Sequence, residues 1–308
     1  MLECSLPTIP AMMQLRDPVA IALLRQLRCY PVVVPGWGEV TTAAIAQTGN
    51  GPAPAPLLFL HGFDSSLLEF RRLLPRLPHW PLYALDLLGM GFTACPAAVP
   101  VTPQTIRQHL YWSWKTLIDR PVTLVGASLG GAVALDFALT YPDCVARLVL
   151  IDSVGFSGSF ALGPWLGTPL LEQGAIWLRW RKEMAFRALD ALAEVGALGS
   201  SSLRDEVLCA ALHQGMPGWQ RGIVTFSQSG GYGNLGAQIQ DIEPPTLILW
   251  GDRDTTLGTQ DAYRFQQAIA DSHLVWIRGA GHVPHLEQPD TVARELCRFG
   301  PYCTGPAD

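Results

Sequence analysis

Short apolar runs recur along this chain and alternate with longer segments that carry a helical pattern. A run in which nearly every position is apolar is typical of a strand that is buried on both faces of a sheet. The runs that predict strands are residues 31–34, 40–46, 57–60, 81–86, 121–126, 147–152, 246–251 and 273–277.

Segments of helical length lie between most of these runs. The first segment begins after Asp17-Pro18, a pair that suits a helix N-cap and a first-turn proline. The segments that predict helices are residues 19–30, 105–118, 129–140, 261–270 and 290–299. Because parallel strands need long crossover connections, which are usually helical, the alternation predicts an α/β fold with a mostly parallel sheet.

The alternation stops between residues 153 and 242, where helical patterns occur without a core strand. We therefore expect a core domain made of residues 1–152 and 243–308, with residues 153–242 inserted as a helical cap. The first part of the insertion, residues 153–171, carries no charge over a length close to that of a membrane span. Its four glycines and two prolines favour an apolar loop over a membrane helix.

Composition excludes several function classes. Hydrophobic residues make up 49% of the 308 residues and charged residues 15%, a balance that intrinsic disorder does not allow. The net charge of −5 argues against a nucleic-acid partner held through its phosphates. The seven cysteines form no C-x-x-C pair, which argues against a disulfide framework or a thiolate zinc site. Residues 1–17 have no basic region ahead of an apolar block, so we expect no signal peptide and an intracellular, cytoplasmic protein.

The strongest chemical signal is the hexapeptide that runs from Gly126 to Gly131, GASLGG, between a predicted strand and a predicted helix. This is a G-x-S-x-G nucleophile elbow in its expected strand–turn–helix context. The sharp turn lifts the Ser128 hydroxyl out of the sheet edge, and the flanking glycines leave room for the neighbouring backbone. We therefore expect Ser128 to be a nucleophile.

A serine nucleophile needs a base, and the base needs a carboxylate that orients it. His282 follows the strand at 273–277, and Asp254 follows the strand at 246–251. Both therefore lie at carboxyl ends of strands, where open parallel sheets bind their ligands. In this type of site the chain order is serine, acid, histidine, which Ser128, Asp254 and His282 follow.

Other residues compete for these two roles. His285 is a second candidate base, although we expect it to pack or to bond locally beside Glu287. Asp252, which we expect to shape its own turn, and Asp152, at the end of the strand at 147–152, are alternative acids. Asp86 precedes Ser128, and we expect it to brace the glycine-rich turn that follows it. The remaining histidines have no chemical context beyond packing or solvent: His61, His79, His109, His213 and His273.

The segment His61-Gly62-Phe63 comes directly after the strand at 57–60. Gly62 lets the backbone turn sharply, so the N–H of Phe63 can face the nucleophile. Together with the N–H of Leu129 it would form an oxyanion hole with two donors. This chemistry requires neither a metal nor an organic cofactor, and we expect none.

With these motifs the chain resembles the α/β-hydrolase family over nearly its whole length. The segments that carry the resemblance are HGF at 61–63, DLLGMGF at 86–92, GASLGG at 126–131, WGDRD at 250–254 and GAGHVPHLEQP at 279–289. The resemblance implies an eight-stranded, mostly parallel sheet with a helical cap inserted after the sixth strand. Ser128 departs from the dehalogenase and epoxide-hydrolase branches, whose nucleophile is an aspartate.

A finer resemblance is to plant and cyanobacterial hydrolases of the chlorophyll dephytylase type. It rests on residues 120–139, 148–153, 228–232 and 281–289, although similar motifs also occur in ordinary esterases. The resemblance implies hydrolysis of a bulky lipophilic ester, such as the phytyl ester of chlorophyll or a derivative, and a peripheral place on a membrane such as the thylakoid. The alternatives are a general carboxylesterase or lipase, an acyl transferase or C–C bond hydrolase with the same triad, and a non-catalytic pigment or lipid carrier.

The expected mouth of the site is apolar, because the uncharged segments 87–106 and 153–171 both follow strands at their carboxyl ends. Lipophilic small-molecule esters suit such a pocket better than sugars or small acids. The candidate substrate-binding residues are Phe156, Trp165, Trp177 and Trp180.

Trp177, Trp180 and Met184 share one helical face, which either lines this mouth or packs the insertion onto the core domain. The cations on the same segment either form a solvated helix face or touch an anionic membrane surface. They are Arg179, Arg181, Lys182 and Arg187.

Overall fold

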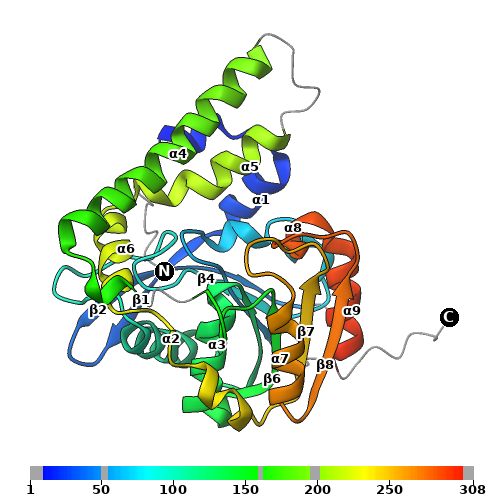
Figure 1. Cartoon of the computed structure of the whole chain (residues 1–308). Helices are drawn as coiled ribbons and strands as arrows, with labels where there is room; N and C mark the ends of the chain where they lie inside the picture. The colour runs from blue at the N-terminus through cyan, green and yellow to red at the C-terminus, as the bar shows by residue number, and fades with distance from the viewer. Residues whose placement is uncertain (1–9, 50–54, 159–161, 195–201, 301–308) are drawn as a thin grey trace.

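The computed structural model describes residues 10–49, 55–158, 162–194 and 202–300 (Figure 1). Its centre is an eight-stranded sheet with the order β1-β2-β4-β3-β5-β6-β7-β8. The last six of these, from β4 to β8, are parallel, whereas β1 and β2 are antiparallel to their neighbours. The expected α/β fold with a mostly parallel sheet is therefore confirmed.

The strands lie close to the predicted segments. They are β1 (Arg28–Val34), β2 (Gly38–Gln47), β3 (Leu57–Leu60), β4 (Leu82–Leu85), β5 (Val122–Ala127), β6 (Val145–Ile151), β7 (Thr246–Gly251) and β8 (Ser272–Ile277). The α-helices are α1 (Pro18–Gln26), α2 (Pro103–Leu117), α3 (Leu129–Thr140), α4 (Thr168–Glu194), α5 (Ser202–Ala211), α6 (Trp219–Gln228), α7 (Gln260–Ala268), α8 (Pro284–Glu287) and α9 (Pro289–Phe299).

The first predicted helix is too long. It was expected to continue to Tyr30, but α1 ends at Gln26 and β1 begins at Arg28. The change occurs because residues 28–34 pair with β2 along their whole length, so tertiary hydrogen bonds outweigh the local helical pattern. The side chains of Val32 and Val34 are then buried against the sheet.

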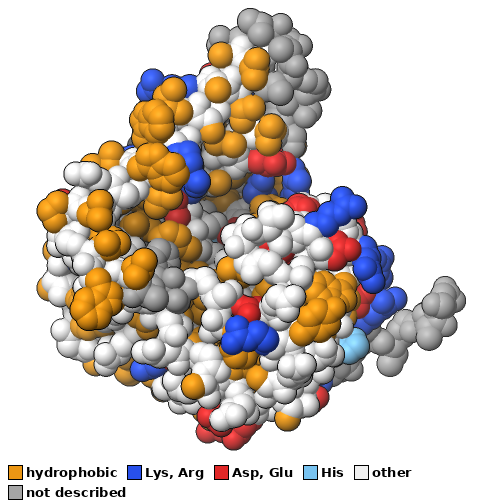
Figure 2. All heavy atoms as spheres, in the orientation of Figure 1, with side chains coloured by type: hydrophobic (Ala, Val, Ile, Leu, Met, Phe, Trp, Pro, Cys, Tyr) orange, Lys and Arg blue, Asp and Glu red, His pale blue; other side chains and the backbone are white. Residues whose placement is uncertain are grey.

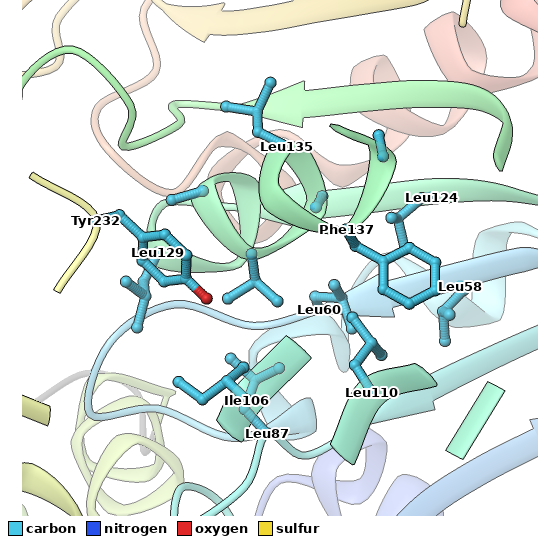
Figure 3. Close-up of a cluster of buried hydrophobic side chains, with 14 of the residues drawn as sticks. Leu58, Leu60, Leu87, Ile106, Leu110, Leu124, Leu129, Leu135, Phe137 and Tyr232 are labelled. Carbon is cyan, nitrogen blue, oxygen red and sulfur yellow. The ribbon is translucent and has the colours of Figure 1, made fainter. Parts of the chain in front are cut away.

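Side chains from alternate positions of the strands form two cores, one on each face of the sheet. Leu58 and Leu60 of β3 face the first core, which α2, α3 and α7 cover. Figure 3 shows part of it, with Phe137 of α3 and Leu110 of α2 packed beside these leucines. Leu57 and Phe59 face the second core, which α1 and α9 cover. This arrangement explains why all four positions of β3 are apolar.

The segment between β6 and β7 holds α4, α5 and α6, and it contains no strand among its described residues. Figure 1 shows α4 lying above the sheet, with α5 and α6 beside it. Ala175 of α4 is buried against Trp219 and Ile223 of α6, so these helices share a small apolar core of their own. Throughout the described ranges, no helix is both long enough and apolar enough to cross a membrane.

The beginning of the described chain is tied to these inserted helices. The buried carboxylate of Asp205, on α5, accepts hydrogen bonds from the backbone N–H groups of Arg16, at 2.6 Å, and of Asp17. The neighbouring Arg204 donates to the carbonyl of Gln14 at 2.9 Å and to Asp205 at 2.8 Å. The inserted helices are therefore held by a contact that lies outside the sheet.

Candidate active site

Ser128 occupies a strained turn between β5 and α3, with φ of +50°. The backbone packs so closely here that only glycine fits on either side. A Cβ added to Gly126 would lie 2.2 Å from the carbonyl oxygen of Gly130, and one added to Gly130 would lie 2.0 Å from that of Leu60. The glycines of the motif therefore allow the turn that presents the Ser128 hydroxyl.

A chain of hydrogen bonds runs from Ser128 through His282 to Asp254. The Nε2 atom of His282 lies 3.0 Å from the Ser128 Oγ, and its Nδ1 atom lies 2.9 Å from Oδ2 of Asp254. The three residues follow β5, β8 and β7, so they meet at the carboxyl edge of the sheet. The structure thus brings together the three residues that the sequence proposed for nucleophile, base and acid.

The environment of Asp254 favours its charged form. Burial alone would raise the pKa of this carboxyl, but the hydrogen bond and charge of His282 bring it below its ordinary value. Its Oδ1 also accepts hydrogen bonds from the N–H groups of Thr256, at 2.7 Å, and Leu257, at 3.2 Å. An anionic Asp254 accepts the Nδ1–H of His282, which leaves Nε2 free to take the proton of Ser128.

Asp152, an alternative acid, lies beside this pair but differs from Asp254 in its bonds. Its side chain is fully buried, and its Oδ1 accepts a hydrogen bond from the Gly251 N–H at 3.0 Å. Burial, together with the nearby Asp254 carboxylate, raises the pKa of Asp152 to about 9. The side chain is therefore neutral near pH 7 and makes no hydrogen bond to His282 within the described structure.

Asp152, Asp254 and His282 also form the one cluster of potential metal ligands found in the described ranges, with ligand atoms within 4.8 Å of one another. Both nitrogens of His282 are already engaged, by Ser128 and by Asp254. In this arrangement His282 links the Ser128 hydroxyl to the Asp254 carboxylate, which is the order that proton transfer requires.

Two other acids hold turns: Asp86 braces the turn that the sequence predicts, whereas Asp252 bonds the turn after β8 rather than its own. Asp252 accepts a hydrogen bond from the Gly279 N–H at 2.6 Å, which holds the turn after β8. Asp86 accepts bonds from the N–H groups of Leu67 and Phe92, both at 2.6 Å, and so braces the glycine-rich turn. Burial raises the pKa of Asp86 to about 7.

His285 is buried and packs against the ring of Phe70, so the expected packing is found, whereas a local bond beside Glu287 is not found among the described contacts. The Nε2 atom of His285 lies 3.0 Å from Oε1 of the buried Glu69, on the opposite side of the loop. Glu287 instead accepts a hydrogen bond from the Gly281 N–H at 2.7 Å. The short helix α8 separates the two side chains, because it turns His285 into the core and leaves Glu287 beneath the His282 loop.

The loop after β3 passes directly over Ser128. A Cβ on Gly62 would lie 3.3 Å from the Cβ of Ser128, and the Gly62 N–H donates to Glu69 at 3.1 Å. His61 is fully buried, and burial lowers its pKa to about 4, so its ring is neutral. Its Nδ1–H donates to the Gly62 carbonyl at 2.8 Å, while its Nε2 accepts from the Leu87 N–H at 3.1 Å. No local pattern around His61 indicates this role in holding the loop, because its partner Leu87 lies on a distant segment.

The two candidate oxyanion donors flank Ser128. Phe63 follows Gly62 in the loop that lies over the serine, and Leu129 follows the serine itself as the first residue of α3. The first N–H groups of a helix have no carbonyl partner within that helix, and they favour negative charge. Both backbone segments lie next to Ser128, and their N–H groups remain the candidate donors to an oxyanion.

An apolar pocket of about 510 Å³ opens beside this loop. Phe63 forms one wall, Ile223 of α6 forms another, and apolar side chains between residues 162 and 178 complete it. The residues from that segment include Leu162, Leu166, Leu170, Leu171, Ala175, Trp177 and Leu178. None of the described residues that line the pocket is charged, so it suits an apolar chain.

The four candidate substrate-binding residues do not lie together. Trp177 lines the apolar pocket, whereas Trp165 and Trp180 are 86% and 55% exposed and are not among its lining residues. Phe156 packs against Phe265, with ring centroids 5.0 Å apart. Of the four, Trp177 is placed to contact a ligand in the pocket.

Two further expectations about the mouth need correction. The face that carries Trp177, Trp180 and Met184 does not pack the insertion onto the core, because all three side chains are at least 44% exposed; only Trp177 of the three lines the pocket. The segment 87–106 supplies no lining residue to this pocket; several of its apolar side chains, Leu88 and Ile106 among them, are instead buried in the first core. Of the two uncharged segments, only residues 153–171 contribute to the lining, through Leu162, Leu166 and their neighbours.

The four cations of α4 do not form a common basic patch. Lys182 bonds the buried Asp64, and Arg179 donates to the Gln214 carbonyl at 2.6 Å. Arg187 pairs with Glu183 one turn away, and Arg181 lies over the ring of Trp177, 5.1 Å from its centroid.

A sequence profile of the Alpha/beta hydrolase family matches residues 57–295, which is more than half of the chain. The chain is 33% identical over 293 residues to the alpha/beta hydrolase domain-containing protein VTE7 of Arabidopsis thaliana, covering 92% of this chain and 87% of the relative. Lipase 1 of Psychrobacter immobilis is 26% identical, with 82% of this chain and 79% of the lipase covered. A solved carboxylesterase of Bacillus subtilis shares the fold, with a TM-score of 0.66 at 21% identity over 96% of this chain and 97% of that one.

Proposed function

Because the chain belongs to the alpha/beta hydrolase family, we propose that it is a serine hydrolase that cleaves a bulky lipophilic ester. The observation that carries the proposal is the hydrogen-bonded chain Ser128–His282–Asp254, together with an apolar pocket that Phe63, in the loop over Ser128, helps to line. Relatives named as a lipase and a carboxylesterase support ester chemistry on this fold.

In the proposed mechanism, the Ser128 oxygen attacks the ester carbonyl while His282 takes the hydroxyl proton. The N–H groups of Phe63 and Leu129 stabilise the oxyanion of the tetrahedral intermediate, and loss of one such donor typically costs about 3 kcal/mol. His282 then gives its proton to the departing alcohol, which leaves an acyl group on Ser128. A water molecule activated by His282 hydrolyses this acyl-enzyme, while Asp254 holds the imidazole throughout.

The pocket supports a long apolar group on the substrate. Each methylene that it removes from water contributes up to about 0.8 kcal/mol. An isoprenoid or a long acyl chain fits this environment, and the dephytylase-type motifs make the phytyl ester of chlorophyll or a derivative the specific candidate. A short, polar ester would leave the pocket unused.

We further propose that residues 153–242 act as a cap on the core formed by residues 1–152 and 243–308, and that the cap touches a membrane such as the thylakoid. Figure 2 shows hydrophobic side chains gathered on the inserted helices. Trp165, Leu170 and Trp180 are at least 55% exposed there, close in sequence to the pocket-lining residues. Tryptophan favours the boundary between water and lipid.

Co-sedimentation of the protein with phospholipid vesicles tests the membrane contact. We expect W165A and W180A to lower the fraction of protein that sediments with the vesicles, whereas V33A, at an exposed position on β1, should not.

Labelling by a fluorophosphonate tests the proposed enzyme directly. We expect one equivalent to attach to the wild-type protein and none to Ser128→Ala. Absence of wild-type labelling would overturn the proposal.

Mass spectrometry of the products then separates ester hydrolysis from acyl transfer and from C–C bond cleavage, because these reactions yield different acyl products. A ligand recovered unchanged after long incubation would instead favour a pigment or lipid carrier.

A further inference from the structure

Asp64 follows Phe63 in the loop over Ser128, and its carboxylate is the centre of a buried hydrogen-bond network. The residue is 6% exposed and has a left-handed backbone with φ of +48°. A residue other than glycine adopts this conformation when surrounding contacts hold it there. The contacts that hold Asp64 are therefore the ones that fix the loop.

All side-chain donors to the Asp64 carboxylate in the described structure come from the inserted helices. Oδ1 accepts from Nε2 of His213 and from Nε1 of Trp219, both at 3.0 Å. Oδ2 accepts from Nε2 of Gln214 at 2.9 Å and from Nζ of Lys182 at 2.8 Å. The Lys182 ammonium also donates to the Asp64 main-chain carbonyl at 2.8 Å.

The charges in this network are consistent with a fixed, water-excluded contact. Burial alone would raise the pKa of Asp64, but the His213 hydrogen bond and the Lys182 ammonium hold it well below its ordinary value. Burial lowers the pKa of His213, so the ring is neutral and donates through Nε2. Removing either side of such a contact leaves a buried charge without its partner, which is costly.

The donors belong to three separate elements of the insertion. Lys182 lies on α4, His213 and Gln214 lie on a 3-10 turn at Leu212–Gly215, and Trp219 begins α6. The same α4 and α6 helices form the apolar pocket that includes Phe63. The single side chain of Asp64 is therefore hydrogen-bonded to α4, to the 3-10 turn and to the first residue of α6.

We infer that Asp64 is a positioning residue that fixes the oxyanion loop to the inserted helices, so that the oxyanion hole is complete only while these helices are docked. The inference rests on the proposed function, because it assigns the Phe63 N–H to the oxyanion. Asp64 touches no reacting atom and acts through the backbone of its neighbour. A displacement of about 1 Å at a catalytic group can cost about 100-fold in rate.

The test compares Asp64→Asn and Lys182→Met with Asp205→Asn. The first two variants break the network from the loop side and from the helix side. Asp205→Asn is the matched control, because it removes the bonds between α5 and the chain start and leaves intact the Asp64 contacts that dock α4 and α6 on the loop. Lys182→Met also keeps the test decisive should Asp64→Asn not fold.

Three readouts are needed. We expect Asp64→Asn and Lys182→Met to lower kcat for a short nitrophenyl ester at least tenfold with KM nearly unchanged. Binding of a trifluoromethyl ketone, whose adduct places an oxyanion in the hole, should weaken by a similar factor. Hydrogen exchange in peptides covering residues 61–68 should accelerate. Asp205→Asn should lower the melting temperature yet keep kcat and ketone affinity.

Unchanged kcat and ketone affinity in both network variants would overturn the inference. So would an equal loss in Asp205→Asn, because that would indicate general loosening of the fold. The hydrogen-exchange measurement does not depend on catalysis, so it separates the two proposals. If the wild-type protein hydrolyses no ester, the proposed function fails. If exchange at residues 61–68 is unchanged in Lys182→Met, the inferred link between the loop and the inserted helices fails.

Discussion

One carboxyl oxygen of Asp152 lies within 4.8 Å of a carboxyl oxygen of Asp254 at the carboxyl edge of the sheet. Asp254 bonds His282 and two backbone N–H groups, whereas Asp152 accepts a bond from the Gly251 N–H. Two buried carboxylates at this distance do not both ionise readily, because like charges disfavour each other. Asp254 is therefore the anion of the pair, and Asp152 is the neutral acid.

The two acids should respond differently to the same substitution. Asp254→Asn removes the charge that orients His282, and we expect kcat to fall by up to about 10,000-fold, the loss known for such a change in another enzyme. Asp152→Asn replaces a neutral acid with a neutral amide that can still accept from Gly251, so activity should stay within about tenfold of wild type. Initial rates on a nitrophenyl ester measure both. An inactive Asp152→Asn beside an active Asp254→Asn would reverse the assignment.

Asp152 also predicts how stability depends on pH. Its pKa is raised to about 9 in the folded protein, so between about pH 4 and pH 9 the folded state holds a proton that the unfolded state releases. The stability that protonated Asp152 contributes is therefore present at low pH and is lost as the pH rises through this window. The free energy of unfolding falls by at most about 1.4 kcal/mol per pH unit.

Asp152→Asn removes that dependence, so the variant should gain stability relative to wild type as the pH rises. Urea unfolding of both proteins at pH 5, 7 and 8.5 measures the difference. Parallel curves for the two proteins would show that Asp152 is ionised in the folded state.

The nucleophile elbow should tolerate no side chain at Gly130. An added Cβ would lie 2.0 Å from the Leu60 carbonyl oxygen, which is part of the sheet and cannot move aside. We expect Gly130→Ala to lower the free energy of unfolding by about 1–3 kcal/mol and to reduce hydrolysis strongly. Gly174→Ala is the matched control, because a Cβ there meets nothing within 4 Å, and alanine should stabilise α4 by about 0.5–1 kcal/mol. Equal unfolding midpoints in urea would contradict the close packing.

Trp177 and Trp180 should differ in their effect on substrate chain length. Trp177 lines the apolar pocket, so Trp177→Ala should lower kcat/KM for nitrophenyl laurate by about tenfold while leaving nitrophenyl acetate nearly unchanged. Trp180 is 55% exposed outside the pocket, and Trp180→Ala should leave both soluble esters near wild type. Equal losses on both esters in Trp177→Ala would mean that this side chain only holds the helices together. A wild-type preference for the acetate would refute the lipophilic substrate.

Local sequence patterns are enough to predict the parallel sheet, the nucleophile elbow and the edge at which the candidate site lies. Apolar runs predict buried strands wherever they occur, and the carboxyl ends of parallel strands must meet at one edge. Ser128, Asp254 and His282 each follow such an end, so their meeting could be predicted from local patterns. Helical spacing likewise placed Trp177 and Trp180 on one face, because that depends on the helix period alone.

Tertiary packing determines which way the face with Trp177 and Trp180 points. It also determines every contact between elements that are distant in the sequence. Packing of Ala175 against α6 rotates α4 so that Trp180 faces solvent. Asp64 meets donors 118 to 155 residues away, and no local pattern indicates which ones they are. Such contacts depend on how helices dock, and docking minimises the free energy of the whole core rather than of any one segment.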